Sequence, residues 1–150
     1  MRFVWVGFSA NYISLYAAIT NLERLVSNGY AIEITIVCDK PVGGEIAGTP
    51  LYSAGGLIDE ELNAVMSSHD IALTPPYPGP WGKVKSNNKT ILAWANGLPH
   101  TTGENYNELV ALMDWETRKR LGETARGWVE ADWTADKSAR EWEALLCASS

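Results

Sequence analysis

Short apolar runs alternate along this chain with segments whose apolar positions recur every three or four residues. The apolar runs predict buried strands at residues 3–7, 32–38, 71–74 and 98–102, with a weaker strand at 50–53. Because strands and helices alternate, the pattern predicts an α/β fold in which helices cover both faces of a parallel sheet. Ligands of such sheets bind at the carboxyl ends of the strands.

Helical spacing defines most of the segments between the strands. The first helix has a cap at Ser9 or Asn11 and ends at Gly29. Its apolar face consists of Leu15, Ile19, Leu22 and Val26. The next two helices have shorter apolar faces, Ile58, Leu62, Val65 and Met66 in one and Ile91, Leu92, Trp94 and Ala95 in the other. Ser86 is the expected cap of the third helix, which Asn96-Gly97 ends.

Two further helices close the chain, one from Asp114 to about Glu130 and one from Thr134. The inward face of the last helix is predicted to be Ala139, Trp142, Leu145 and Leu146. Tryptophans on apolar faces are expected in the core, namely Trp5, Trp94, Trp128 and Trp142. Trp81 differs, because it lies in a proline- and glycine-rich loop at 75–85, where it either covers a ligand or packs the loop.

A chain of 150 residues with 46% hydrophobic residues fits one domain over residues 1–150. Its 12 basic and 18 acidic residues give a net charge of -6, which disfavours binding to nucleic acid but leaves room for a small anion in a local pocket. Cys38 and Cys147 are far apart and form no CxxC pair, so neither a disulfide framework nor a zinc site is expected.

The apolar runs and the two cysteines also bear on where in the cell the protein is expected. The apolar start of the chain is interrupted by Ser9, Asn11 and Ser14, which favours a folded strand and helix over an export signal. No uninterrupted apolar run of about 18 residues is present, so no membrane span is expected. With reduced thiols as the simplest reading of the two cysteines, we expect a cytoplasmic protein.

The first strand-to-helix turn, Gly7-Phe8-Ser9, lacks the GxGxxG spacing of dinucleotide sites and the GxxxxGK[ST] phosphate loop. The glycine in this turn is explained equally well by a tight turn that binds nothing and by a turn that a ligand approaches closely. The segment from Lys83 to Lys89 is more informative, since three lysines, one serine and two asparagines cluster at a helix start. Such a cluster predicts a phosphate site or, equally, a solvated helix start.

Other polar side chains near the expected ligand edge allow two interpretations each. His69 and His100 are single histidines at element edges and are more often capping or surface residues than bases or ligands. Neither has a metal-ligand partner at a recognisable spacing. Glu104 either reaches a ribose hydroxyl or is an acid favoured by a helix start.

Several segments occur in a familiar order. They are Asp70–Pro75, Lys85–Lys89, Ala93–Pro99, Tyr106–Leu109, Arg118–Arg126, Trp133-Thr134 and Trp142–Leu146. The ordered set resembles the C-terminal, donor-binding half of GT-B glycosyltransferases, and is similar to glycosyltransferase family 4 (group 1). The resemblance covers roughly residues 1–147 and implies one Rossmann-like, doubly wound half-domain closed by two C-terminal helices.

The resemblance implies a nucleoside diphosphate sugar as substrate, with neither a metal nor a further cofactor. The residues that would hold the diphosphate are Gly7, Phe8, Ser9, Lys85, Ser86, Asn87, Asn88 and Lys89. Those near the base and ribose would be Leu51, Tyr52, Ser53 and Glu104. No catalytic residue is assigned. The acceptor-binding half is absent, which implies a partner domain, a partner chain or a homo-oligomer.

Two departures from the family pattern leave alternatives open. Val84 and Leu92 stand where retaining members of the family often carry two glutamates. The basic pair of the family's first turn is also absent. The main alternative is therefore a non-catalytic module of the same fold that binds a nucleotide or a protein. An unrelated doubly wound protein is a further one, although the turn at Gly7-Phe8-Ser9 lacks the acidic cluster of a receiver domain.

Overall fold

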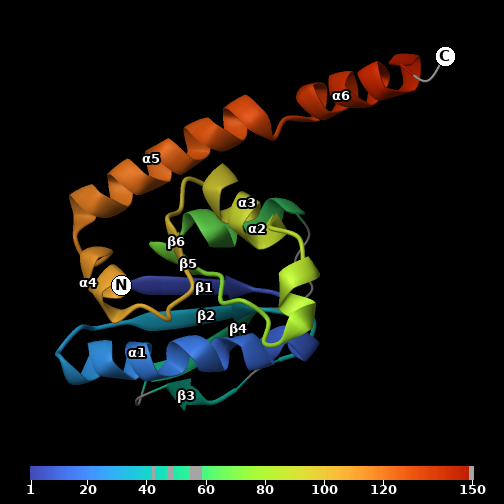
Figure 1. The fold of residues 1–150 in the computed structure, drawn as a ribbon. Coiled ribbons are helices and arrows are strands. Elements are labelled where there is room, and N and C mark those ends of the chain that lie inside the picture. Colours follow the sequence, from blue (N-terminus) through green and yellow to red (C-terminus); the bar gives the residue numbers. More distant parts are fainter. Residues whose placement is uncertain (42, 47–48, 55–58, 149–150) are drawn as a thin grey trace.

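The computed structural model describes residues 1–41, 43–46, 49–54 and 59–148. Its strands are β1 (Arg2–Val6), β2 (Glu33–Val37), β3 (Glu45–Ile46), β4 (Thr49–Ala54), β5 (Ile71–Leu73) and β6 (His100–Thr101). They form one sheet with the order β3-β4-β2-β1-β5-β6 (Figure 1). Neighbouring strands from β4 to β6 are parallel, and only the short β3 is antiparallel to its neighbour. The predicted α/β fold with a parallel sheet is confirmed, and the topology is compatible with a Rossmann-like fold.

Six α-helices and two 3-10 helices are present in the described part of the chain. The α-helices are α1 (Tyr16–Ser27), α2 (Asp59–Ser67), α3 (Asn88–Ala95), α4 (Tyr106–Ala111), α5 (Trp115–Asp132) and α6 (Ala135–Ala148). The 3-10 helices are η1 (Ser9–Leu15) and η2 (Pro80–Val84). The sequence pattern missed the short elements α4, β3 and η2. It merged η1 with the first helix, and the expected cap at Ser9 or Asn11 was wrong, because no side chain caps η1 or α1.

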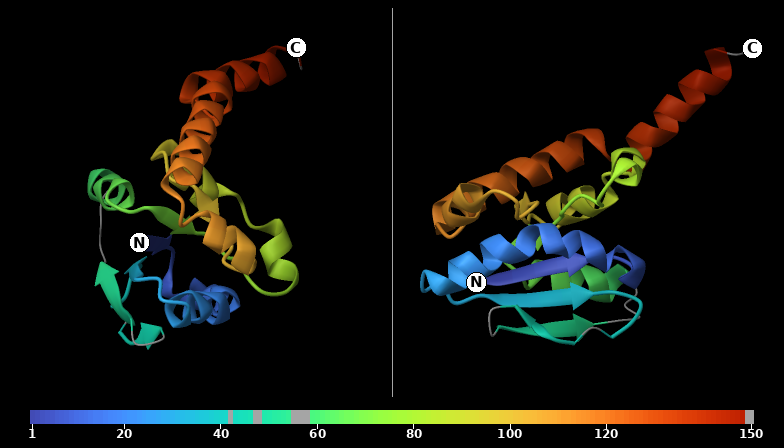
Figure 2. Two further views of the ribbon diagram at one scale, coloured as in Figure 1. Left: turned by 90° about the vertical axis from the view of Figure 1, so that its left-hand side faces the viewer. Right: turned by 60° about the horizontal axis from the view of Figure 1, so that its bottom comes forward.

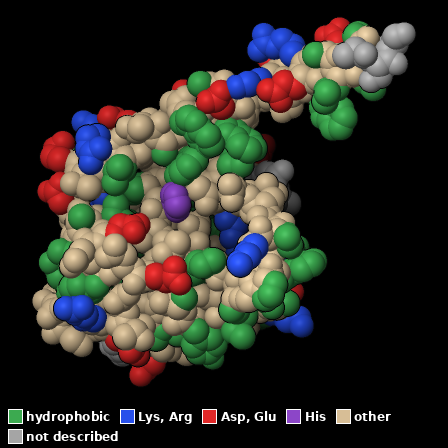
Figure 3. Space-filling view, in the orientation of Figure 1, with side chains coloured by type: hydrophobic (Ala, Val, Ile, Leu, Met, Phe, Trp, Pro, Cys, Tyr) green, Lys and Arg blue, Asp and Glu red, His purple; other side chains and the backbone are tan. Residues whose placement is uncertain are grey.

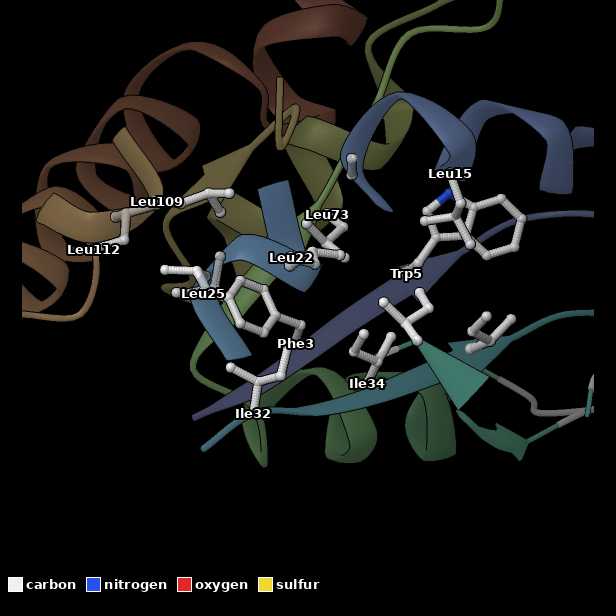
Figure 4. Packing of buried hydrophobic residues seen from close by; sticks show 14 of the residues in the cluster. Phe3, Trp5, Leu15, Leu22, Leu25, Ile32, Ile34, Leu73, Leu109 and Leu112 are labelled. Atoms are coloured by element: carbon white, nitrogen blue, oxygen red, sulfur yellow. The ribbon is translucent and has the colours of Figure 1, made fainter. Parts of the chain in front are cut away.

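Alternation along β1 places the core on both faces of the sheet. Phe3 and Trp5 are fully buried on one face, where they pack against α1 and α4 (Figure 4). Val4 is buried on the opposite face with Met66 of α2 and Ala93 of α3. Successive side chains of a strand point to opposite faces, so this one short strand anchors both layers.

The two C-terminal helices differ in how they meet the rest of the chain. Helix α5 packs along α3, and a Cβ at Gly122 would lie 2.1 Å from the carbonyl oxygen of Gly97, so only glycine permits this approach. Helix α6 instead projects away from the sheet and its helices (Figures 1 and 2).

The expected inward face of the last helix was therefore wrong. Trp142, Leu145 and Leu146 have exposed fractions of 66%, 62% and 69%. Trp128 is also exposed rather than in the core, whereas Trp94 is half-buried and Trp5 is buried as expected. Apolar spacing identifies a helix face, but it does not state which element covers that face.

Helix ends were predicted with mixed success. Asp114 caps α5 through its carboxylate, which accepts from the Thr117 N–H at 2.8 Å, and Thr134 caps α6 in a similar way. Ser86 does not cap α3, because Asn87 precedes the first helical residue and no side chain caps it. Ile58, expected on the face of α2, lies outside the described residues. No helix in the described ranges has both the length and the apolar character needed to cross a membrane.

Candidate anion-binding site

A cavity of about 450 Å³ opens where β5 ends, between η1, the loop that follows β5 and the start of α3. Its lining includes Asn11, Ser14, Tyr77, Lys85 and Lys89, together with the backbone at the α3 N-terminus. None of the lining side chains is acidic. Figure 3 shows basic side chains in and beside a hollow on this face. In a chain with a net charge of -6, this is a local region of positive charge.

The proline- and glycine-rich loop gives one wall of the cavity its shape. Gly79 has a φ of 79° and precedes η2, and Pro80 begins that turn. A Cβ at Gly82 would lie 2.0 Å from the carbonyl oxygen of Tyr77, so the loop closes tightly on itself only with glycine there. The closed loop holds Tyr77 and Lys85 on the same side of the cavity.

Lys85 has only uncharged partners in the described structure. Its Nζ donates to Asn11 Oδ1 at 2.6 Å and lies 4.2 Å from the centroid of the Tyr77 ring. These contacts orient the ammonium group without neutralising it. An exposed cation held by neutral groups remains available to an anion in the cavity.

Lys89 reaches back across the cavity to the first strand. Its Nζ lies 4.4 Å from the centroid of the buried Trp5 ring. Burial, and then repulsion by Lys85, lower the pKa of Lys89 from 10.5 to about 8. No carboxylate in the described ranges lies within 4 Å of either lysine. The structure thus holds a half-buried ammonium without a counter-ion, an arrangement that a bound anion would stabilise.

Two buried polar atoms nearby also lack partners among the described residues. Ser14 is 3% exposed, lines the cavity, and its Oγ has no hydrogen-bond partner. Trp5 Nε1 is likewise buried without an acceptor. The first N–H groups of α3 add donors, since a helix leaves its first turn without intrahelical acceptors. Ammonium, hydroxyl and amide donors together suit a phosphate group.

The turn at Gly7-Phe8-Ser9 supports the site rather than lining it. A Cβ at Gly7 would lie 2.6 Å from Lys89 Nζ and 2.7 Å from the Trp5 ring, so glycine leaves room for this lysine. Ser9 donates its N–H to Asp39 Oδ1 at 2.5 Å and its hydroxyl to Oδ2 at 3.2 Å. The Ser9 N–H bond lowers the pKa of the Asp39 carboxyl. Phe8 is exposed, and none of the three turn residues is in the cavity wall.

The predicted base and ribose residues are divided between two places. Glu104 lines a cavity of about 410 Å³ that shares Ser14, Pro76 and Tyr77 with the anion-binding cavity. Leu51 lines a different cavity of about 190 Å³, between β4 and η1. Tyr52 and Ser53 belong to β4, but their side chains lie outside the described part of the structure. Among the predicted base and ribose residues whose side chains are described, only Glu104 lines a cavity that adjoins the anion-binding cavity.

Sequence patterns did not identify Asn11, Ser14 or Tyr77 as site residues. The available sequence signal for Ser14 was its position next to the apolar Leu15, and both residues are buried in the structure. His69 lies elsewhere: its Nε2 is 2.8 Å from Thr35 Oγ1 and its Nδ1 is 2.6 Å from the Val65 carbonyl oxygen. Trp81 is 64% exposed and is not among the residues that line the anion-binding cavity. The described residues contain no cluster of three or more His, Cys, Asp or Glu that could hold a metal ion.

Comparison with known proteins does not identify a family. No protein-family model matches the chain, and no curated protein matches it either. The assignment of a function therefore depends on the chemistry of the site.

Proposed function

We propose that the chain binds a nucleoside diphosphate sugar and serves as the donor half of a GT-B glycosyltransferase. The observation that carries the proposal is the acid-free cavity at the end of β5, where Lys85 and Lys89 lack a counter-ion. A diphosphate supplies the missing negative charge. The doubly wound arrangement of that family also places its donor at the carboxyl ends of the strands.

The proposed chemistry is stabilisation of a leaving group. As the glycosyl bond breaks, negative charge develops on the diphosphate, and Lys85, Lys89 and the first N–H groups of α3 lie where they would stabilise it. The neighbouring cavity with Glu104 offers an acceptor for ribose hydroxyl groups. Since no carboxylate lines the anion-binding cavity, the group that activates the acceptor would come from an acceptor-binding partner.

A non-catalytic module of the same fold is the second candidate. Two positions favour it, because Val84 is 73% exposed and Leu92 packs in the core formed by Val4 and Met66. Neither side chain can replace a carboxylate in binding or catalysis. This module would bind the nucleotide through the same lysines without transferring a sugar.

The first experiment is a thermal-shift and calorimetry panel with UDP, GDP, dTDP, CDP and their sugars, with inorganic pyrophosphate beside them. A ligand at a hundredfold its Kd is expected to add about 2.7 kcal/mol of stability. Selective stabilisation by one nucleotide supports the proposal, and Lys85→Ala should weaken that binding by about tenfold with the fold intact. If only pyrophosphate binds, the anion site is supported, but the proposal that it holds a nucleotide is rejected. An unchanged affinity in Lys85→Ala would reject the assignment of the lysine.

Glycosyl transfer is a separate question. Hydrolysis of the bound nucleotide sugar, or its transfer once an acceptor-binding partner is added, would support the enzyme. Tight nucleotide binding with no turnover under either condition would favour the non-catalytic module.

A further inference from the structure

A further cavity, of about 600 Å³, lies between α3, β6, α4 and α5. Trp94 and Trp128 form part of its wall, with ring centroids 4.9 Å apart and planes at 85°. The His100 ring adds a third surface, 5.3 Å from Trp94. Figure 3 shows hydrophobic side chains gathered on this face beside a histidine. The cavity shares no lining residue with the anion-binding cavity, and its volume is typical of small-molecule sites.

The lining of this aromatic cavity is negative or neutral. Glu108 is its only acidic side chain, and no lysine or arginine is among the lining residues. Burial lowers the pKa of His100, which leaves the imidazole neutral near pH 7. Its Nδ1 is already bonded to Thr74 Oγ1 at 2.9 Å. Glu108 forms no ion pair within the described ranges, so its charge is available to a ligand.

The side chains of the cavity wall favour some ligand classes over others, and cations and sugars are the classes to compare. Indole faces attract positive charge. A primary ammonium ion or a sugar would lose water and find few hydrogen-bond partners in this mainly apolar wall. A quaternary ammonium group has no N–H to satisfy and presents methyl groups to the rings, so it suits the cavity better than either.

We propose that the aromatic cavity binds a small organic cation with a quaternary ammonium group, held by Trp94, Trp128 and Glu108. Trp128 is 43% exposed, so a ligand can reach its ring from solvent. This site goes beyond the proposed donor site and does not depend on it.

Calorimetric titration with choline tests the proposal, with 3,3-dimethyl-1-butanol as the uncharged ligand of the same shape. Choline is expected to bind about tenfold more tightly, because only the cation gains from the indole faces and the carboxylate. Equal affinities would overturn recognition of charge. No binding of choline up to millimolar concentrations would overturn the site itself.

Three variants separate the contributions. Glu108→Gln should weaken choline binding about threefold, as expected for an exposed ion pair, whereas Glu116→Gln on α5 outside the cavity should leave it unchanged. Trp128→Leu should weaken it about tenfold. Lys85→Ala should leave choline binding unchanged, which distinguishes failure of this site from failure of the donor site. Unchanged affinity in both Glu108→Gln and Trp128→Leu would overturn the proposal.

Discussion

Basic side chains line two cavities at opposite edges of the sheet, and the two groups have different partners. At the carboxyl edge, Lys85 and Lys89 contact an amide oxygen and aromatic rings only. At the amino edge, a cavity of about 430 Å³ is lined by Arg2, Arg118 and Arg126, among other residues. Counting basic side chains alone would rank the amino edge first.

Two arginines of the amino edge are paired with carboxylates, and the third bonds backbone carbonyl oxygens. Arg2 lies 3.9 Å from the Asp70 carboxylate, and Arg126 Nε donates to Glu130 Oε1 at 3.0 Å. Arg118 Nη1 donates to the carbonyl oxygens of Leu112 and Met113, at 2.8 and 2.9 Å. These contacts stabilise the folded chain. Lys85 and Lys89 have no carboxylate partner in the described ranges, unlike Arg2 and Arg126, and this difference, rather than the number of basic side chains, indicates where an anion would bind.

The largest expected effect is on diphosphate binding. Lys89→Met should weaken binding of the nucleoside diphosphate selected by the panel by about 30-fold, because a hydrogen bond to a charged group is lost in a half-buried site. Arg126→Met, at the other edge, should change that affinity less than about twofold. Calorimetry on the two variants makes the comparison. Similar losses in both would show that general electrostatics, rather than a built site, attract the anion.

The pH dependence of binding sharpens the same comparison. An anion stabilises the charged form of Lys89, so binding raises a pKa that stands near 8 in the free protein. Affinity for the nucleotide sugar, whose phosphates do not titrate in this range, should therefore be constant below about pH 7 and fall about fivefold by pH 9, as binding comes to require uptake of a proton. Titrations in buffers of different ionisation enthalpy measure that uptake. Lys89→Met should remove the dependence, and a wild-type affinity that stays flat to pH 9 would contradict it.

The smallest expected effect is on the stability of the ligand-free protein, where the two edges should respond in opposite directions. Lys89→Met should raise the free energy of unfolding by about 1 kcal/mol at pH 7, after allowance for the solvent that still reaches the ammonium. Arg118→Met should lower it by about 1 kcal/mol, because two carbonyl oxygens lose their donor. Urea denaturation of both variants gives the two values.

The sign of the lysine effect can be checked with pH. The folded-state pKa of Lys89 is below its ordinary value of 10.5, so the unfolded chain binds more protons between about pH 8 and 10.5. Below about pH 8 the folded protein bears the full cost of burying the charged lysine. Between about pH 8 and 10.5 that cost is progressively lost, so the free energy of unfolding of the wild-type protein rises. The advantage of Lys89→Met should shrink accordingly by pH 10. If Lys89→Met is still more stable than the wild type at pH 10, its higher stability comes from packing rather than from removal of the charge.

Sequence patterns located the strands well and the helix surroundings poorly. The apolar runs found β1, β2, β5 and β6, because burial on both faces leaves a short continuous signal. Helical spacing of apolar residues placed Trp142 in the core, although α6 extends away from the sheet. A helical apolar face looks the same in sequence whether this chain covers it or leaves it exposed.

The sequence by itself determined the α/β alternation and the clustering of Lys85 and Lys89 at a helix start, since both depend on neighbours within a few residues. Only the tertiary structure decided that Lys89 lies over Trp5, that Lys85 bonds Asn11, and that no acid lines the cavity between them. These contacts join residues more than 70 positions apart. Parallel strands β1 and β5 bring those positions to one edge of the sheet, and periodicity along the chain carries no information about such a meeting.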